Sequence, residues 1–285
     1  MDAQRKESLA RTMLGCLIEE SRAHGVWVPD SIVDVLDKRD ASFQNLWDAT
    51  RAMMNVRPPW KASPQFLIAQ DELLPDLIAE AGICTVADAE PCEGDARMSL
   101  WRGDITTLAA DAIVNAANSG MTGCWQPLHY CIDNAIHTFA GVQLRAEMAS
   151  IMEAQGHEEP TAHARITGAY NLPSKHIIHT VGPIAKGRLT EERRRQLARC
   201  YTACLDTANA HDCLSIALCC ISTGVFGFPR KEAAEIAVRT VREWLADHSD
   251  SPMVVVFNVF GDEDEAIYRD LLQLDQKGAS HVQIR

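Results

Sequence analysis

Apolar residues recur at helical spacing through the first third of the chain. Between residues 4 and 24, one face of the expected helix carries the apolar residues Leu9, Met13, Leu17 and Ile18. A second apolar face over residues 43–54 predicts another helix. The run Arg57-Pro58-Pro59-Trp60 ends this pattern, because proline lacks the backbone N–H and clashes with the preceding turn.

A third helix is expected to begin at Ser63-Pro64, where serine suits the cap and proline the first helical position. Its apolar residues are Phe66, Leu67, Leu73, Leu74 and Leu77. Pro75 is expected to kink or divide it. No set of residues here points to chemistry, so this part of the chain is interpreted as a packing layer or cap.

From about Met98, short apolar runs alternate with helical patterns. Strands are expected at 113–114, 176–181, 215–221 and 253–260, and helices at 131–151, 190–211, 230–247 and 264–274. This alternation predicts an α/β domain with a largely buried sheet. The polar stretch 88–96 marks the expected boundary, which divides the chain into a helical N-terminal extension (1–95) and a second domain (96–285).

Composition narrows the class of protein. The chain has 285 residues, 47% of them hydrophobic and 23% charged, which is typical of a globular protein. A formal net charge of −12 argues against sequence-specific nucleic-acid binding. No apolar run approaches the roughly 20 residues that span a bilayer, and the start MDAQRKESLA lacks the apolar stretch of a secretory signal. We therefore expect a cytoplasmic protein without membrane contact, whose ten cysteines are mostly thiols.

Three loops that follow expected strands are rich in small and polar residues, and ligands of α/β sheets bind at the carboxyl ends of strands. The first loop is 115–124, with sequence NAANSGMTGC. In it, Asn118 can donate to and accept from ribose hydroxyls, and Gly120 and Gly123 allow a ligand close to the backbone. An ordinary turn has the same composition, so both interpretations stay open.

The second loop runs from Ser222 to Phe228, between an apolar strand and a helix. Its glycines and hydroxyls can direct several backbone N–H groups at phosphate oxygens. It lacks the lysine of a P-loop nucleotide site. Phe226 and Phe228 either wall a sugar or base, or fill core.

The third loop holds Cys124, His129 and Cys131 within eight residues, a donor set and spacing suited to zinc. A closed structural site needs four protein ligands, whereas a catalytic site has three plus water or substrate. His137 is close, and four more distant histidines are possible fourth ligands: His157, His163, His176 and His179. The alternative is that both cysteines are buried apolar thiols.

Other candidate residues have simpler interpretations. Four cysteines lie on a helix stripe or in an apolar strand and are expected in the core: Cys200, Cys204, Cys219 and Cys220. Asp133 stands at the start of an expected helix. It either caps that helix through its charge or orients a water or a ribose hydroxyl.

Over about residues 98–273, the chain resembles the macrodomain family, whose members bind ADP-ribose. The resemblance rests on Gly103-Asp104-Ile105-Thr106, Val114-Asn115-Ala116-Ala117-Asn118, Cys131-Ile132-Asp133-Asn134-Ala135-Ile136-His137 with Ala140-Gly141, His179-Thr180-Val181-Gly182-Pro183, and Ile221-Ser222-Thr223-Gly224-Val225-Phe226-Gly227-Phe228-Pro229. It implies a three-layer α/β/α fold with a central mixed sheet.

One departure narrows the resemblance. Most macrodomain hydrolases have a glycine-rich run where this chain has Gly123-Cys124-Trp125-Gln126-Pro127-Leu128-His129-Tyr130-Cys131. In this it resembles the zinc-containing branch of microbial protein-ADP-ribose hydrolases, as does the helical leader with Arg57-Pro58-Pro59 and Gln70-Asp71-Glu72-Leu73-Leu74. Some members of that branch are associated with sirtuin-type ADP-ribosyltransferases and lipoyl-carrier proteins.

The resemblance implies a role for each matching residue. Asp104 would accept a hydrogen bond from the adenine amino group, and Ile105 would contact the ring through its backbone. Asn118 would bind the distal ribose, with Cys131, Ile132 and Asp133 beside it. The diphosphate would lie against Ser222, Thr223, Gly224, Val225 and Phe226. Zinc would be held by Cys124, His129 and Cys131, and the candidate catalytic residues are Asn118 and Asp133.

These roles predict a zinc-dependent hydrolase that removes mono-ADP-ribose from modified protein side chains and releases ADP-ribose. An open metal position would fix the sugar and lower the pKa of the group that it binds. Three alternatives remain: a non-catalytic ADP-ribose-binding module, a hydrolase of O-acetyl-ADP-ribose, and a purely structural zinc.

Overall fold

The computed structural model describes residues 1–187 and 189–274. Its N-terminal helices are α1 (Ala3–Ala23), α2 (Asp30–Asp37), α3 (Phe43–Val56) and α4 (Pro64–Ala81). The strands are β1 (Cys84–Thr85), β2 (Glu90–Cys92), β3 (Asp95–Arg102), β4 (Leu108–Ala109), β5 (Ala112–Ala117), β6 (Ala164–Gly168), β7 (His176–Val181), β8 (Ser215–Leu218) and β9 (Val254–Val259). Among them lie α5 (Ile132–Ala140), α6 (Val142–Gln155), α7 (Glu191–Ala210), α8 (Arg230–Asp247), α9 (Asp262–Leu272) and two short 3-10 turns, η1 (Val86–Asp88) and η2 (Ile105–Thr107).

Seven of these strands form one mixed sheet in the order β2-β3-β9-β8-β5-β7-β6. The five inner strands are parallel, and β2 and β6 pair antiparallel at the two edges. Strands β1 and β4 form a separate parallel pair. Strands β5, β7, β8 and β9 are buried almost throughout because helices cover both faces of the sheet, which explains their largely apolar sequences.

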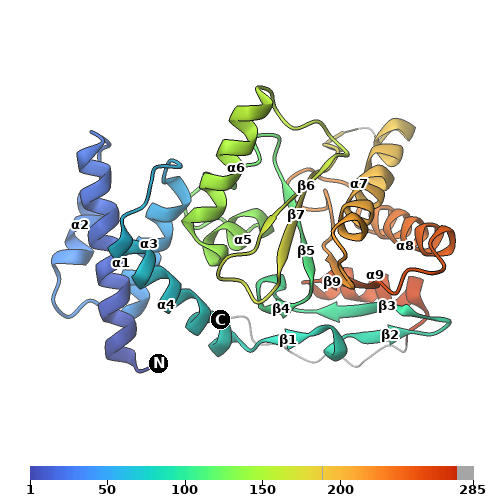
Figure 1. The fold of residues 1–285 in the computed structure, drawn as a ribbon, viewed down its shortest axis with the longest axis horizontal. Helices are drawn as coiled ribbons and strands as arrows, with labels where there is room; N and C mark the ends of the chain where they lie inside the picture. Colours follow the sequence, from blue (N-terminus) through green and yellow to red (C-terminus); the bar gives the residue numbers. More distant parts are fainter. Residues whose placement is uncertain (188, 275–285) are drawn as a thin grey trace.

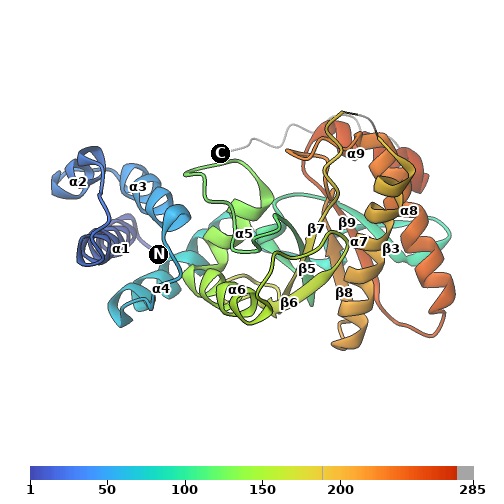
Figure 2. The same ribbon diagram turned by 90° about the horizontal axis from the view of Figure 1, so that it is seen from above.

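The helices lie in two layers. Figure 1 shows α5 and α6 on one side of the strands and α7, α8 and α9 on the other, and the view from above agrees (Figure 2). Helices α1 to α4 lie beyond α5, at the end of the molecule (Figure 1). This confirms the predicted three-layer α/β/α fold with a central mixed sheet and a helical N-terminal region.

The N-terminal helices have a hydrophobic core of their own. It includes the fully buried residues Met13, Leu14, Leu46, Leu73 and Leu74, and Val142 at the start of α6 joins it. Serine caps begin two of the helices: Ser42 accepts from Asn45 N–H, and Ser63 accepts from Phe66 N–H. Of the two alternatives for Pro75, division of the helix is wrong, because α4 continues through Pro75. Helix α2 was not predicted.

The polar stretch 88–96 contains strand β2 and the start of β3, which pair as a hairpin on the main sheet. Polar composition arises there because β2 is an edge strand with one side open to solvent. The division of the chain at residues 95 and 96 remains a prediction, and residues 275–285 lie outside the described part of the chain. Among the residues that are described, no helix is long and apolar enough to cross a membrane.

The single helix expected over 131–151 is two helices, α5 and α6, which meet at Gly141. Gly141 has φ 101° and ψ 173°, a backbone conformation that essentially only glycine adopts. A Cβ atom built on it would lie 2.6 Å from the Gln70 amide nitrogen of α4. Gln70 in turn accepts a 2.9 Å hydrogen bond from Val142 N–H, which has no partner within its own helix. The break therefore seats α6 against the N-terminal helices.

Replacing Gly141 by alanine is expected to lower the free energy of unfolding by about 2–5 kcal/mol, measured by urea denaturation. Backbone strain accounts for about 1–3 kcal/mol, and the buried Gln70 side chain must also leave its partners. Gly156→Ala is the matched control. Gly156 also has positive φ, but its Cβ would meet nothing within 4 Å, so we expect a loss of only about 1 kcal/mol. Equal losses in the two variants would contradict the role assigned to Gln70.

Candidate active site

The carboxyl ends of the five parallel strands lie on one edge of the sheet, and the expected site residues follow these ends. Asp104 follows β3, Asn118 follows β5, and the 219–229 loop follows β8. In the sheet, β3 and β5 are separated by three strand-to-strand steps, with β8 next to β5. The residues that follow β3, β8 and β5 thus form a row along this edge of the sheet. At about 4.8 Å a step, the ends of β3 and β5, which are the two ends of this row, are about 14 Å apart.

At one end of the row, Asp104 caps η2. Its Oδ1 accepts from Thr106 N–H at 2.9 Å and from the Thr106 hydroxyl at 2.8 Å. The preceding Gly103 is held by β9, since its N–H donates to Val259 O and its carbonyl accepts from the Asn258 amide. Asp104 is exposed and Ile105 is buried. The Asp104 carboxylate is thus fixed by local bonds and open to solvent.

In the middle of the row, the loop after β8 turns its backbone outward. Within the described chain, the N–H groups of Gly224, Val225 and Phe226 donate to no protein acceptor. The Ser222 hydroxyl is buried and also lacks a partner there. Ser222 packs so closely on Gly182 that a Cβ on that glycine would lie 2.1 Å from the hydroxyl oxygen. Several donors are therefore available to one ligand.

The two phenylalanines of this loop have different positions. Phe228 is 2% exposed and belongs to the core, whereas Phe226 is half-buried and its carbonyl accepts from Ala185 N–H at 2.8 Å. Only Phe226 is therefore placed to contact a ligand. The sequence pattern alone left both alternatives open.

At the other end of the row, Asn118 organises its own loop. Its amide donates to Gly123 O at 3.0 Å and to Asp133 Oδ2 at 3.2 Å, and its Oδ1 accepts from Gly120 N–H at 2.9 Å. An amide group has two N–H donors, and both are used. Asn118 can therefore only accept a hydrogen bond from a ribose hydroxyl, through the second lone pair of Oδ1.

Asp133 is 5% exposed, on the first turn of α5. Besides Asn118, its carboxylate accepts from the Asn115 amide, at 2.8 Å through Oδ1. Burial raises the pKa of Asp133 to about 6, and the hydrogen bonds from the two asparagine amides oppose that rise. Each carboxylate oxygen can accept more than one bond, so Asp133 keeps acceptor capacity.

Two buried histidines lie near Asp133, His137 directly and His179 through Asn115. His179 on β7 contacts Asn115 through Nδ1 and the Thr167 hydroxyl through Nε2, and burial lowers its pKa to about 3. Since Asn115 must donate to Nδ1, the ring is neutral with its proton on Nε2. His137 Nε2 lies 3.6 Å from Asp133 Oδ1, and burial lowers its pKa well below the ordinary value. Asn115 and Thr167 were not predicted, because their partners are distant in sequence.

Cys124, His129 and Cys131 come together on the loop before α5, with their donor atoms within 4.8 Å of one another. Cys124 Sγ and His129 Nδ1 are 3.5 Å apart, the separation of about 3.5 Å that two tetrahedral zinc ligands have. Cys131 Sγ caps α5 and accepts from Asn134 N–H. Two soft sulfur donors and an imidazole in one place fit zinc.

A fourth protein ligand is not evident among the residues that the structure describes. The clustered donors are these three alone, and His179 has both ring nitrogens engaged in hydrogen bonds. Three ligands leave a tetrahedral ion one open position. Within the described chain, all ten cysteines are free thiols. Cys200, Cys204 and Cys219 are buried in the core as expected, whereas Cys220 is half-buried and packs against it.

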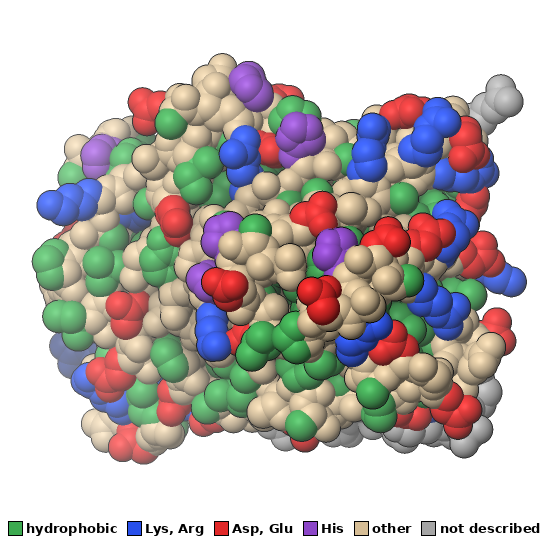
Figure 3. Space-filling model, turned by 45° about the vertical axis from the view of Figure 1, so that its right-hand side comes forward, with side chains coloured by type: hydrophobic (Ala, Val, Ile, Leu, Met, Phe, Trp, Pro, Cys, Tyr) green, Lys and Arg blue, Asp and Glu red, His purple; other side chains and the backbone are tan. Residues whose placement is uncertain are grey.

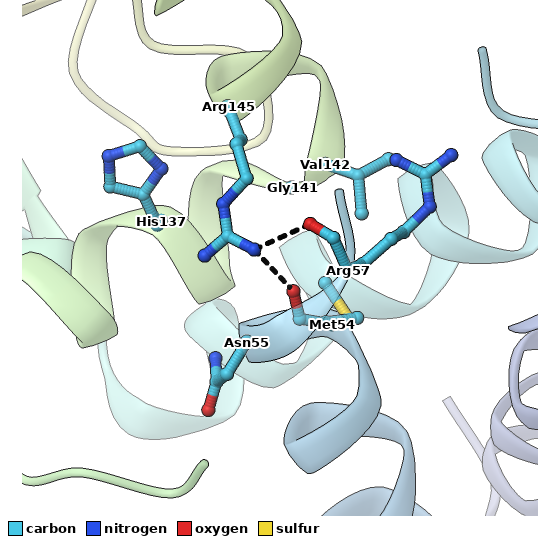
Figure 4. A pocket seen from close by; sticks show the side chains of 7 residues that line it. All are labelled: Met54, Asn55, Arg57, His137, Gly141, Val142 and Arg145. Atoms are coloured by element: carbon cyan, nitrogen blue, oxygen red, sulfur yellow. Dashed lines mark hydrogen bonds between the residues drawn. The ribbon is translucent and has the colours of Figure 1, made fainter. Parts of the chain in front are cut away.

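The N-terminal helices contact this loop directly, which the sequence pattern did not predict. Figure 4 shows Arg145 of α6 between His137 and the end of α3. Its guanidinium donates to Met54 O at 3.1 Å, Arg57 O at 2.7 Å and Thr122 O at 2.8 Å, and it lies 4.3 Å from the centre of the Trp125 ring. Arg145 thus joins three segments, and burial lowers its pKa to about 10.

Charge on the visible surface is mixed. In Figure 3, basic side chains are interspersed with acidic ones. On α7 the pairs include Arg194 with Glu232 and Arg199 with Glu192. An anionic ligand would accordingly depend on the local N–H groups of the 222–228 loop.

Comparison with known proteins places this site in a family. The family model described as "Macro domain" matches residues 114–237. A protein-ADP-ribose hydrolase from Treponema medium is 54% identical over 258 residues, which cover 90% of this chain and 94% of that protein. A protein-ADP-ribose hydrolase from Staphylococcus aureus (strain MSSA476) is 49% identical over 237 residues, 82% of this chain and 88% of that protein.

A solved structure agrees with these relatives. The Trypanosoma brucei macrodomain in complex with ADP-ribose is 28% identical, has a TM-score of 0.60 and covers 78% of this chain and 95% of its own. The two hydrolases extend the similarity to most of the chain. This chain belongs to the Macro domain family.

Proposed function

We propose that this protein is a zinc-dependent ADP-ribosylhydrolase that removes mono-ADP-ribose from modified protein side chains. The observation that carries the proposal is the row along the sheet edge: a carboxylate at Asp104, free N–H donors in the 222–228 loop, and the Asn118–Asp133 pair beside a Cys/His/Cys group. The two bacterial relatives are protein-ADP-ribose hydrolases, which supports the hydrolytic part of the proposal.

The row has the order of the parts of ADP-ribose. Asp104 accepts from the adenine amino group, and the backbone of Ile105 contacts the ring. The diphosphate lies on the N–H groups of Gly224, Val225 and Phe226, with Ser222 and Thr223 beneath it. The distal ribose reaches Asn118, Ile132 and Asp133. The length of about 14 Å from β3 to β5 suits an extended dinucleotide-like molecule.

The three donors Cys124, His129 and Cys131 would hold the zinc ion. When bound, zinc acts as a Lewis acid that fixes a ribose hydroxyl or water and lowers its pKa. The fit rests on the soft donor set and on the 3.5 Å separation of Cys124 Sγ and His129 Nδ1. Cys131 adjoins Ile132 and Asp133 in sequence, so the group lies next to the proposed ribose position.

In the reaction, the bond between the anomeric carbon of the distal ribose and the modified side chain breaks, and water supplies the new oxygen. Asp133, held by Asn115 and Asn118, positions that water and accepts its proton. The released side chain takes up a proton from solvent. Asn118 accepts from a ribose hydroxyl and keeps the carboxylate in place.

The substrate partner is then an ADP-ribosylated protein, and ADP-ribose is the product released from the same site. We further propose, on the resemblance to the zinc-containing branch, that a sirtuin-type ADP-ribosyltransferase supplies the modified protein. A transferase and a hydrolase acting on one linkage form a reversible modification system.

The test is a hydrolysis assay on proteins with Asp/Glu-, Ser- and Arg-linked ADP-ribose, with free O-acetyl-ADP-ribose as a further substrate. We expect release of ADP-ribose from at least one modified protein and a zinc content near one ion per chain by metal analysis. The control variant is Asp206→Asn. Asp206 is an exposed carboxylate on α7, in the helix layer on the opposite side of the sheet from α5, and it accepts a hydrogen bond from the Trp244 ring N–H.

Each other outcome favours a different function. Binding of ADP-ribose without release from any modified protein would make the chain a binding module. Hydrolysis of the free ester alone would make it an O-acetyl-ADP-ribose hydrolase. A chain that hydrolyses at full rate without metal would disprove the zinc dependence.

A further inference from the structure

The loop that carries the three donors has a strained backbone. Leu128, one residue before His129, has φ 54°, in the left-handed region. A leucine there costs roughly 1–2 kcal/mol relative to a right-handed conformation. Such a residue persists only where its surroundings hold it in place. The loop therefore needs an anchor outside itself.

Asn55 of α3 is that anchor. Its Oδ1 accepts from Leu128 N–H at 2.9 Å, and its Nδ2 donates to the Thr138 hydroxyl of α5 at 3.0 Å. Asn55 is 2% exposed, so these bonds form away from water and cannot be replaced by it. One buried side chain of the N-terminal region thus bonds both the donor loop and the helix that follows it.

Neighbouring contacts act on the same loop. Arg51, one turn before Asn55 on α3, donates to Asn134 Oδ1 at 3.1 Å, and the Asn134 amide donates to Gln126 O at 3.0 Å. Arg145 lies against Trp125 and bonds the carbonyls at the end of α3. These contacts fix the loop to α3, and among the residues that the structure describes Asn55 alone hydrogen-bonds Leu128 itself.

We propose that Asn55 is a positioning residue: by holding Leu128, it orients Cys124, His129 and Cys131 for the metal, so that the N-terminal helices take part in the site. The expected effect of Asn55 on zinc binding and on the reaction rate rests on the proposed zinc function. Its geometric part, the protection of one amide hydrogen, does not depend on that function.

The test compares Asn55→Ala with Thr138→Val in the full chain. Thr138→Val removes the α5 end of the bridge and keeps the acceptor for Leu128. We expect Asn55→Ala to speed exchange of the Leu128 amide hydrogen at least tenfold by NMR. We expect it to weaken zinc binding by about 10–100-fold in competition with a chelator, as for other residues that orient metal ligands. Thr138→Val should leave both values within about twofold.

A rescue variant separates positioning from general stability. Asn55→Asp keeps an acceptor oxygen for Leu128 N–H, and we expect it to bind zinc within about threefold of wild type. In Asn55→Ala, kcat should fall while the Kd of ADP-ribose stays within about threefold, because the adenine and diphosphate positions are elsewhere. If Asn55→Ala does not fold, Asn55→Ser replaces it with the same expectations. The serine hydroxyl is one bond closer to the backbone than Asn55 Oδ1, so it does not reach Leu128 N–H.

The results decide between two roles. Equal zinc affinity and Leu128 exchange in wild type and Asn55→Ala, or equal changes in Asn55→Ala and Thr138→Val, would overturn the positioning role. Absence of hydrolysis by the wild type would instead defeat the proposed function. The exchange and zinc measurements would still decide whether Asn55 positions the loop.

Discussion

Replacing Cys131 by serine is expected to remove bound zinc and to lower the rate of ADP-ribose release by about a hundredfold or more. A bound metal supplies several kcal/mol of transition-state stabilisation, and each 1.4 kcal/mol is a factor of ten in rate. Serine is chosen because Cys131 caps α5 by accepting from Asn134 N–H, and a serine hydroxyl can make the same bond. The helix should stay capped while the soft donor is lost.

The matched control is Cys84→Ser, another half-buried free thiol, which lies in the small β1–β4 pair and is not one of the three clustered donors. It should keep the zinc content and the rate of the wild type. Hydrolysis by Cys131→Ser at the wild-type rate would rule out the role of zinc in the reaction. A purely structural zinc predicts a different result: chelation would unfold the protein, seen as loss of circular dichroism, rather than give a folded inactive chain.

Replacing Asp133 by asparagine is expected to lower kcat by about 100- to 1,000-fold. A general base contributes typically about 10²–10⁴-fold to a rate, and asparagine cannot accept the proton of water. The new amide also meets the donating amides of Asn115 and Asn118, so one hydrogen bond is lost. Initial rates on the best substrate from the linkage panel, with the melting temperature beside them, measure the effect.

The stability of this variant should change little, because two effects oppose each other. Losing a hydrogen bond costs about 1–3 kcal/mol, whereas removing a carboxylate that is 5% exposed relieves its desolvation. Asp206→Asn, introduced above, controls for the substitution itself. Wild-type kcat in Asp133→Asn would show that another group activates the water.

Much of the fold and part of the site could be predicted from local sequence. Helices α1, α3 and α4 and the buried strands β5, β7, β8 and β9 follow from periodicity, which depends only on residues near one another. Cys124, His129 and Cys131 stand within eight residues, so their clustering needs no tertiary contact to be expected. The same holds for the caps at Ser42 and Ser63, whose bonds reach three residues along the chain.

Errors arose where a local pattern has a non-local cause. The break at Gly141 depends on Gln70, 71 positions earlier, whose side chain occupies the space of a Cβ. Pro75 does not divide α4, since both faces of that helix have tertiary partners: the N-terminal core and the start of α6. Periodicity contains no information about either neighbour.

The sequence by itself determined which residues are able to do chemistry: two thiols and an imidazole on one loop, an asparagine after a strand, and glycines before a helix. Only the tertiary structure decided how these groups are used. It left Asn118 solely an acceptor, enclosed Asp133 between two amides, and attached Leu128 to Asn55, 73 residues away. The physical reason is that donor and acceptor capacity belongs to a side chain, whereas its remaining free lone pairs and protons depend on every neighbour that folding brings to it.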